Sequence, residues 1–187
     1  MDMKKVIILT GMPGSGKSTA AMEFSNLNVP VIGMGDAIRK EMRRLGIEIN
    51  NRSLRLFSKR MTKIHGKKYV INLVKKELLE VFKTNNIAVL DGARRISEVE
   101  EVKKEGYRPA ILAIIADKEV RFNRIVKRKN ESDFSSYSEF EWREKQELGY
   151  GISEVIASAD YYIDNNGSEE IFLQNIKRFL SKLRALR

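Results

Sequence analysis

A chain of 187 residues, 42% of them hydrophobic, has the size of one compact domain and can bury a substantial core. Lys and Arg number 35 against 25 Asp and Glu, an excess of ten that suits anionic partners such as nucleotides, although a solvated, ion-paired surface explains it as well. Cysteine is absent, which excludes disulfides, thiolate metal sites and a cysteine nucleophile. No apolar run approaches the roughly 20 residues of a membrane span, and no signal peptide precedes the first strand, so we expect a cytoplasmic protein without a membrane partner.

Short apolar segments alternate with longer helical patterns, which is typical of strand–helix units around a parallel sheet. Five strands are predicted, over 4–10, 29–34, 86–91, 109–116 and 159–165. Helices are predicted over 17–27, most of 36–83, 95–106, from the fourth strand to about 129, and 167–183 with Ser168 as N-cap. The pattern indicates a single α/β domain over 1–187, with a helical insertion at about 36–83 and a short polar cover at about 129–142.

The segment GMPGSGKS lies between the first strand and the first helix and matches G-x-x-x-x-G-K-[ST] at every fixed position. Its glycines let backbone N–H groups turn toward an anion, and the helix that follows adds the positive end of its dipole. Lys17 can reach the terminal phosphates, and the Ser18 hydroxyl can ligate Mg²⁺. The sequence therefore predicts a nucleoside triphosphate site with Mg²⁺, formed by Gly11, Met12, Pro13, Gly14, Ser15, Gly16, Lys17, Ser18 and Thr19.

Two further stretches bring polar residues to the ends of predicted strands. MGDAIRK follows the second strand, where the forked guanidinium of Arg39 suits a phosphate; an ordinary helix with Asp36 as N-cap is the alternative. VLDGARR ends the third strand, and Asp91 is predicted to hold Mg²⁺ directly or through water.

The segment from 121 to 145 carries arginines on both sides of a serine-rich excursion. Arg124 and Arg128 are four residues apart and share a helix face, and Arg143 follows the excursion. The segment resembles the lid of short-lidded nucleotide kinases, whose closure would bring positive charge onto a transferring phosphoryl group; solvated helix charges are the alternative. We expect the nearby Phe140 and Trp142 to serve packing.

Together these motifs resemble the P-loop kinase superfamily of adenylate kinases and dephospho-coenzyme A kinases. The chain is most similar to a group of archaeal adenylate-kinase-related proteins, through TGMPGSGKS, MGDAIRKE, DGARRISEVEEVK and LGYGISEVIASADYYIDNNGS, so the likeness spans nearly the whole chain. The resemblance implies a three-layer P-loop kinase fold with a five-stranded parallel sheet, an acceptor-binding insertion and a short lid, with ATP and Mg²⁺ as ligands.

The resemblance also implies roles for individual residues. Asp91 and the lid arginines Arg124, Arg128 and Arg143 would join Lys17 in phosphoryl transfer. The acceptor would contact Gly35, Asp36, Arg39, Gly92 and either Arg94 or Arg95; the family's Phe-Pro is replaced by Ala93-Arg94, so the choice between the two arginines stays open. Asn165, with Asn166 and Gly167, would approach the adenine base, although a plain Asn-Gly turn explains this segment as well.

Three functions remain open from the sequence. The first is transfer of the γ-phosphoryl group of ATP to a nucleoside monophosphate, AMP as first guess, by a monomer or small homo-oligomer. The second is transfer to a hydroxyl, as in dephospho-coenzyme A kinases, with Asp36 as base. The third is a nucleic-acid-associated ATPase, because residues 36–80 hold 13 Lys and Arg against five acids.

Overall fold

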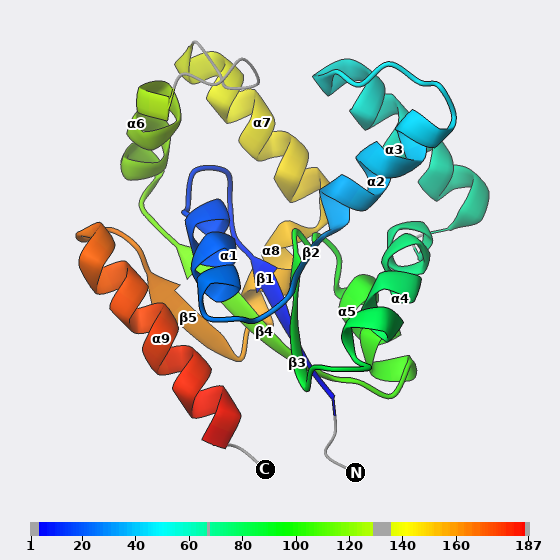
Figure 1. Cartoon of the computed structure of the whole chain (residues 1–187). Helices are drawn as coiled ribbons and strands as arrows, with labels where there is room; N and C mark the ends of the chain where they lie inside the picture. The colour runs from blue at the N-terminus through cyan, green and yellow to red at the C-terminus, as the bar shows by residue number, and fades with distance from the viewer. Residues whose placement is uncertain (1–3, 67, 129–135, 186–187) are drawn as a thin grey trace.

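The computed structural model describes residues 4–66, 68–128 and 136–185 and has a central sheet of five parallel strands (Figure 1). The strand order is β2-β3-β1-β4-β5, which confirms the predicted sheet. The strands are β1 Lys5–Thr10, β2 Val31–Gly33, β3 Ile87–Asp91, β4 Arg108–Ile115 and β5 Tyr161–Asp164.

Helices connect the strands and also form the two insertions. They are α1 Lys17–Asn26, α2 Met34–Arg44, α3 Asn51–His65, α4 Tyr69–Val81, α5 Ile96–Lys104, α6 Lys118–Arg128, α7 Tyr137–Tyr150, α8 Ile152–Ala157 and α9 Glu169–Ala185. The expected insertion at 36–83 consists of α2, α3 and α4. Of the expected cover, 129–135 lies outside the described residues, and the remainder begins α7, whose N-cap is Ser136.

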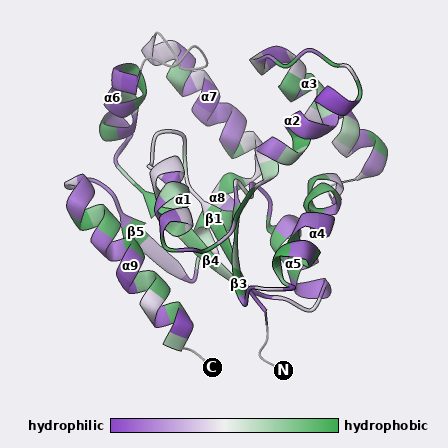
Figure 2. Cartoon of the chain, in the orientation of Figure 1, coloured by the Kyte–Doolittle hydropathy of each residue, from purple (hydrophilic) through white to green (hydrophobic). Residues whose placement is uncertain are grey.

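Alternating side chains of β1 enter two separate cores. Ile7 and Leu9 pack with α1 and α9, whereas Val6 and Ile8 pack with α2, α4, α5 and α8. All four side chains are at most 1% exposed. A strand that is apolar on both faces must be covered on both, so the sheet lies between two helical layers. Figure 2 shows this apolar sheet beneath helices whose outer surfaces are hydrophilic.

The carboxyl ends of the parallel strands meet at one edge, where α2 and α3 rise on one side and α6 and α7 on the other (Figure 1). Gly11 follows β1 here, Gly92 follows β3 and Asn165 follows β5. Ligands of open parallel sheets bind at such an edge. Within the described ranges, no helix combines the length and apolar character needed to cross a membrane.

Candidate functional site

The loop after β1 has the backbone conformation expected of a phosphate cradle. Gly14 and Gly16 have φ angles of +80° and +106°, in the region that side chains rarely adopt. A Cβ atom at Gly14 would meet the carbonyl oxygen of Arg121 at 2.5 Å, and one at Gly16 would overlap the amide of Asn165. Glycine is therefore required at both positions by conformation and by space.

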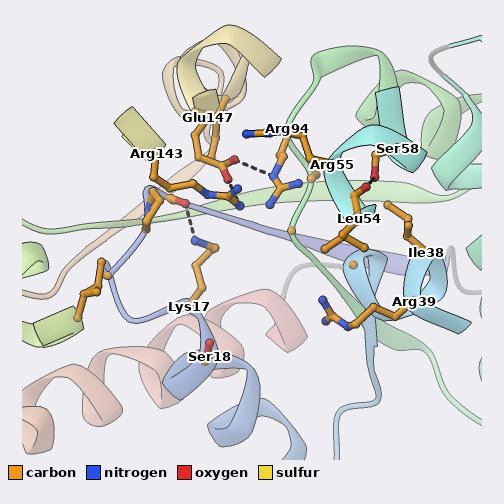
Figure 3. Close-up of a pocket in the computed structure, with 18 of the residues that line it drawn as sticks. Lys17, Ser18, Ile38, Arg39, Leu54, Arg55, Ser58, Arg94, Arg143 and Glu147 are labelled. Atoms are coloured by element: carbon orange, nitrogen blue, oxygen red, sulfur yellow. Dashed lines mark hydrogen bonds and ion pairs between the residues drawn. The ribbon is translucent and has the colours of Figure 1, made fainter. Parts of the chain in front are cut away.

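Lys17 reaches back over the loop from the start of α1. Its Nζ donates to the carbonyl oxygens of Gly11 at 2.5 Å and Met12 at 3.3 Å (Figure 3). The side chain is partly open to a cavity, yet protein atoms crowd its ammonium group. This desolvation lowers the pKa of Lys17 to about 8, although the charges of Asp91 and Glu147 oppose the shift. An ammonium held by carbonyl oxygens and short of solvent is ready to exchange them for phosphate oxygens.

Asp91 ends β3 beside the loop and is paired in register with Leu9 of β1. Its Oδ1 is buried without a hydrogen-bond partner among the described residues. Burial raises the pKa of Asp91, and the charge of Lys17 opposes this. A buried carboxylate oxygen without a donor fits a hydrated cation, and Ser18, exposed at the loop, offers a hydroxyl. These two residues would hold Mg²⁺.

Two adjoining cavities lie above this edge of the sheet. The first, called the loop cavity, has a volume of about 560 Å³; the second, called the α2 cavity, has about 340 Å³. They form one cleft, because they share the lining residues Lys17, Gly35, Ile38, Arg39, Leu54, Arg55, Ser58, Gly92, Arg94 and Arg143. Of the other candidates, Gly11, Pro13, Gly14, Ser18 and Arg128 line the loop cavity, and Asp36, Asp91 and Arg95 line the α2 cavity.

A single carboxylate on α7 joins two arginines of the cleft. Glu147 is 3% exposed; its Oε2 forms an ion pair with Nε of Arg94 at 2.7 Å, and its Oε1 with Nη2 of Arg143 at 2.6 Å. Figure 3 shows both guanidinium groups converging on this carboxylate. Arg94 follows β3 and Arg143 lies on α7, so Glu147 ties the loop after β3 to α7.

On α2, Arg39 folds back onto its own helix. Its Nη2 donates to Oδ1 of Asp36 at 2.6 Å, and its Nε donates to the same oxygen at 3.1 Å. The Asp36 side chain is 74% exposed. The guanidinium therefore lies at the cleft with a carboxylate that an incoming anion can replace.

Both members of the arginine pair after β3 lie at the cleft, but in different settings. Arg94 lines both cavities, whereas Arg95 lines the α2 cavity and extends toward Glu98, 3.9 Å from its carboxylate. Glu98 also accepts the backbone N–H groups of Arg94 and Arg95, at 2.8 and 3.1 Å. The structure thus places Arg94 nearer the phosphate loop.

Several candidates support the loop from outside the two cavities. Arg124 donates to Oδ1 of Asn165 at 3.3 Å, and Nδ2 of Asn165 donates to the carbonyl oxygen of Ser15 at 2.7 Å. Neither Arg124 nor Asn165 lines the loop cavity or the α2 cavity. The side chain of Asn165 is therefore committed to the phosphate loop. Met12, Ser15, Gly16 and Thr19 likewise do not line the cleft.

Sequence reasoning missed Arg121 and Glu147 and misjudged Trp142. Arg121 is 7% exposed, donates to the carbonyl oxygen of Pro13 at 3.2 Å and pairs with Glu144 at 2.5 Å, so it braces the loop from α6. The spacing of Arg143 and Glu147 by four residues was an available signal. Phe140 is buried as expected, but Trp142 is 46% exposed and lines the loop cavity.

Comparison with known proteins agrees with the fold. A family model described as an AAA domain matches residues 10–142. A UPF0200 protein of Pyrococcus horikoshii is 38% identical over 180 residues, which are 95% of this chain and 97% of that protein. A shikimate kinase from Bacteroides thetaiotaomicron superposes with a TM-score of 0.59 at 20% identity, covering 96% of this chain and 99% of that one. A dephospho-CoA kinase from Campylobacter jejuni gives 0.60 at 16% identity, covering 96% and 97%.

The two solved structures share the fold, and the family model and the UPF0200 relative cover most of the chain. The protein has the α/β fold of P-loop kinases, as the resemblance implied. The chain belongs to the family described as an AAA domain, and it is also a member of the archaeal UPF0200 proteins.

Proposed function

We propose that this protein transfers the γ-phosphoryl group of ATP to a small phosphorylated acceptor, with a nucleoside monophosphate, AMP first, as the candidate. The observation that carries the proposal is the convergence of Arg39, Arg94 and Arg143 with Lys17 on one cleft. These residues come from α2, the loop after β3, α7 and the phosphate loop. A simple nucleotide-binding site has no use for a second set of phosphate-gripping side chains.

In this mechanism the backbone of the phosphate loop and Lys17 hold the triphosphate, and Ser18 and Asp91 hold Mg²⁺. The bound cation neutralises charge on the phosphates. Arg39 and Arg94 hold the phosphate of the acceptor, and Arg143 compensates the charge that develops during transfer. Positioning and charge compensation are what phosphoryl transfer requires, and an anionic phosphate acceptor needs no general base.

An acceptor hydroxyl would need a base to take its proton, and Asp36 is the residue at the α2 cavity that could act. Two solved structures with this fold are a shikimate kinase and a dephospho-CoA kinase, so hydroxyl acceptors are included in the test. The pairing of Asp36 with Arg39 supports a phosphate acceptor instead, because the carboxylate is engaged in orienting that arginine.

The test is ATP turnover against a panel of nucleoside monophosphates, dephospho-coenzyme A and shikimate, with Lys17→Ala as the inactive control. We expect turnover with a monophosphate, retained in Asp36→Asn. Turnover confined to a hydroxyl acceptor and lost in Asp36→Asn would replace the proposal with its alternative. Absence of turnover with every acceptor would refute kinase activity toward this panel.

A second candidate function is a nucleic-acid-associated ATPase. It is supported by Arg60 and Lys63 of α3, which are exposed, line neither cavity and have no ion-pair partner among the described residues. Such a surface suits a phosphate backbone. Binding of a random oligonucleotide that weakens steeply with salt would favour it, and no binding at low salt would eliminate it.

A further inference from the structure

Helix α3 forms one wall of the cleft and presents three cations to it. Arg52 lines the loop cavity, Lys59 lines the α2 cavity, and Arg55 lines both. Residues three and four apart lie on the same side of a helix, so these three form a row along the cleft, here called the basic row. Figure 3 shows Arg55 on this wall, apart from Lys17 of the phosphate loop.

The basic row carries charge that the protein leaves uncompensated. Asp36 forms an ion pair with Arg39, and Glu147 forms ion pairs with Arg94 and Arg143. By contrast, no ion pair involves any member of the basic row within the described part of the chain, and α3 itself contains no Asp or Glu. Across the two cavities, nine Lys and Arg and four Asp and Glu among the described residues form the lining. A cleft with this imbalance is suited to more negative charge than one phosphate provides.

Helix α3 is capped at its start and anchored in the core behind the basic row. Asn50 and Ser53 form a reciprocal capping box at the start of α3, and Phe57, 6% exposed, anchors the helix in the core. The guanidinium of Arg55 lies over the ring of Trp142, 5.0 Å from its centroid. A guanidinium stacked on an aromatic ring keeps its N–H edges free to bind an anion. Arg55 is therefore positioned before any ligand arrives.

We propose that the basic row binds a second phosphate group of the acceptor, remote from the group that receives the phosphoryl group. The proposal rests on the phosphotransferase function above and specifies its substrate class as a small molecule with two separate phosphates. The first phosphate would lie between Arg39 and Arg94, and the second would lie along α3, with Arg55 and Arg52 as its principal ligands. AMP alone would leave these two guanidinium groups unused.

The experiment compares AMP with adenosine 3′,5′-bisphosphate, which differs by one remote phosphate. Binding of each is measured by calorimetry to the full chain with a non-hydrolysable ATP analogue present, so that no turnover occurs. We expect the bisphosphate to bind about tenfold tighter or more, since its second phosphate adds charge-assisted hydrogen bonds to the basic row. The double variant Arg52→Gln/Arg55→Gln should lose this preference and bind AMP within about threefold of the wild type.

The matched control is Arg60→Gln/Lys63→Gln, which removes the same charge from side chains of the same helix that line neither cavity, and it should keep the preference. Thermal unfolding of both variants checks that α3 is intact. Equal affinities for AMP and the bisphosphate in the wild type, or equal losses in the two variants, would overturn the subsite. An oligonucleotide that displaces the bisphosphate at nanomolar concentration would instead assign the row to nucleic acid. A retained bisphosphate preference without any phosphoryl transfer would refute the kinase proposal and leave the subsite standing.

Discussion

Among individual side chains, Glu147 is the clearest case of a residue that acts through others. A carboxylate in a cleft proposed to bind phosphates would repel the ligand. Its presence there is explained if it holds cationic side chains in place. Each of its oxygens holds one arginine, Arg94 at 2.7 Å and Arg143 at 2.6 Å, and the two arginines come from different elements. Glu147 thus fixes the relative positions of two guanidinium groups before substrates bind, as a positioning residue.

The variant Glu147→Gln tests this role. We expect kcat for phosphoryl transfer to fall about 10-fold to 100-fold, because misplacing the groups around the reacting phosphate by an ångström is enough for such a loss. KM for ATP should stay within about threefold, since the phosphate loop is untouched. Steady-state kinetics with the acceptor identified by the panel measure both.

Glu141→Gln serves as the control, because Glu141 lies on the same helix but pairs with Lys118 away from the cleft. It should retain wild-type kcat. A Glu147→Gln protein with normal kcat and a raised KM would show that Glu147 contributes to binding alone.

Glu98 offers a test based on pH. It accepts the backbone N–H groups of Arg94 and Arg95 at the start of α5, and burial raises its pKa although those hydrogen bonds oppose the shift. A carboxyl whose pKa is higher in the folded than in the unfolded state favours folding at low pH, and this contribution is lost as pH rises through the folded pKa.

In Glu98→Gln an acceptor oxygen remains for both N–H groups and the titration is removed. We therefore expect the free energy of unfolding of the wild type, relative to Glu98→Gln, to decrease from pH 4 to pH 7. Urea unfolding at several pH values measures it. A relative stability that rises with pH would mean that the charge of Arg95 outweighs burial.

At the level of helices and loops, the phosphate loop depends on close contact with α6. The backbone of Arg121 occupies the space that a side chain at Gly14 would need. Gly46, after α2, provides a comparison, because its φ of +68° is also left-handed but a Cβ there would meet no atom within 4 Å.

Both Gly→Ala substitutions should incur the left-handed backbone cost of about 1–2 kcal/mol, and only Gly14→Ala should add a steric one. We expect Gly14→Ala to be the less stable of the two in denaturant unfolding and to lose ATP binding, with binding retained in Gly46→Ala. Equal losses of stability with intact nucleotide binding would show that the loop can move away from α6.

The elements that the sequence predicted best are those encoded by local patterns. The apolar run ending at Gly11 and the G-x-x-x-x-G-K-S motif identified β1, the phosphate loop and α1, because backbone conformation and glycine placement are local properties. The insertion was predicted only as helical. Its division into α2, α3 and α4 depends on packing: α2 and α4 enter the core through Ile38 and Val74, and α3 joins them through Phe57.

Side-chain partners in the cleft could not be predicted in the same way. Arg94 and Glu147 are 53 residues apart, and Arg55 and Trp142 are 87 apart, so only the assembled fold brings each pair together. Of the neighbouring Arg94 and Arg95, only Arg94 lines both cavities, and this depends on the turn after β3, where Glu98 fixes the backbone.

For the molecule as a whole, the cleft joins the two insertions above a single sheet, and ligand binding should therefore stabilise the entire fold. A ligand that binds only the folded state at 100 times its Kd adds about 2.7 kcal/mol to the free energy of unfolding. For a domain of this length each kcal/mol corresponds to roughly 2–4 °C in Tm.

We accordingly expect saturating ATP with Mg²⁺ to raise Tm by roughly 5–11 °C, in scanning calorimetry at fixed protein concentration. Without ligand, Lys17→Ala should unfold at or slightly above the wild-type Tm, because the variant lacks the ammonium group that folding desolvates. With ATP, its Tm should rise much less than that of the wild type. In a control measurement, inorganic phosphate replaces ATP at the same ionic strength. Because the chain carries a net charge of +10, this control separates the Tm shift caused by specific ATP binding from the shift caused by screening of that charge. An equal shift in the wild type and in Lys17→Ala would mean that the triphosphate binds elsewhere on the basic surface, and the cleft would lose its assignment as the nucleotide site.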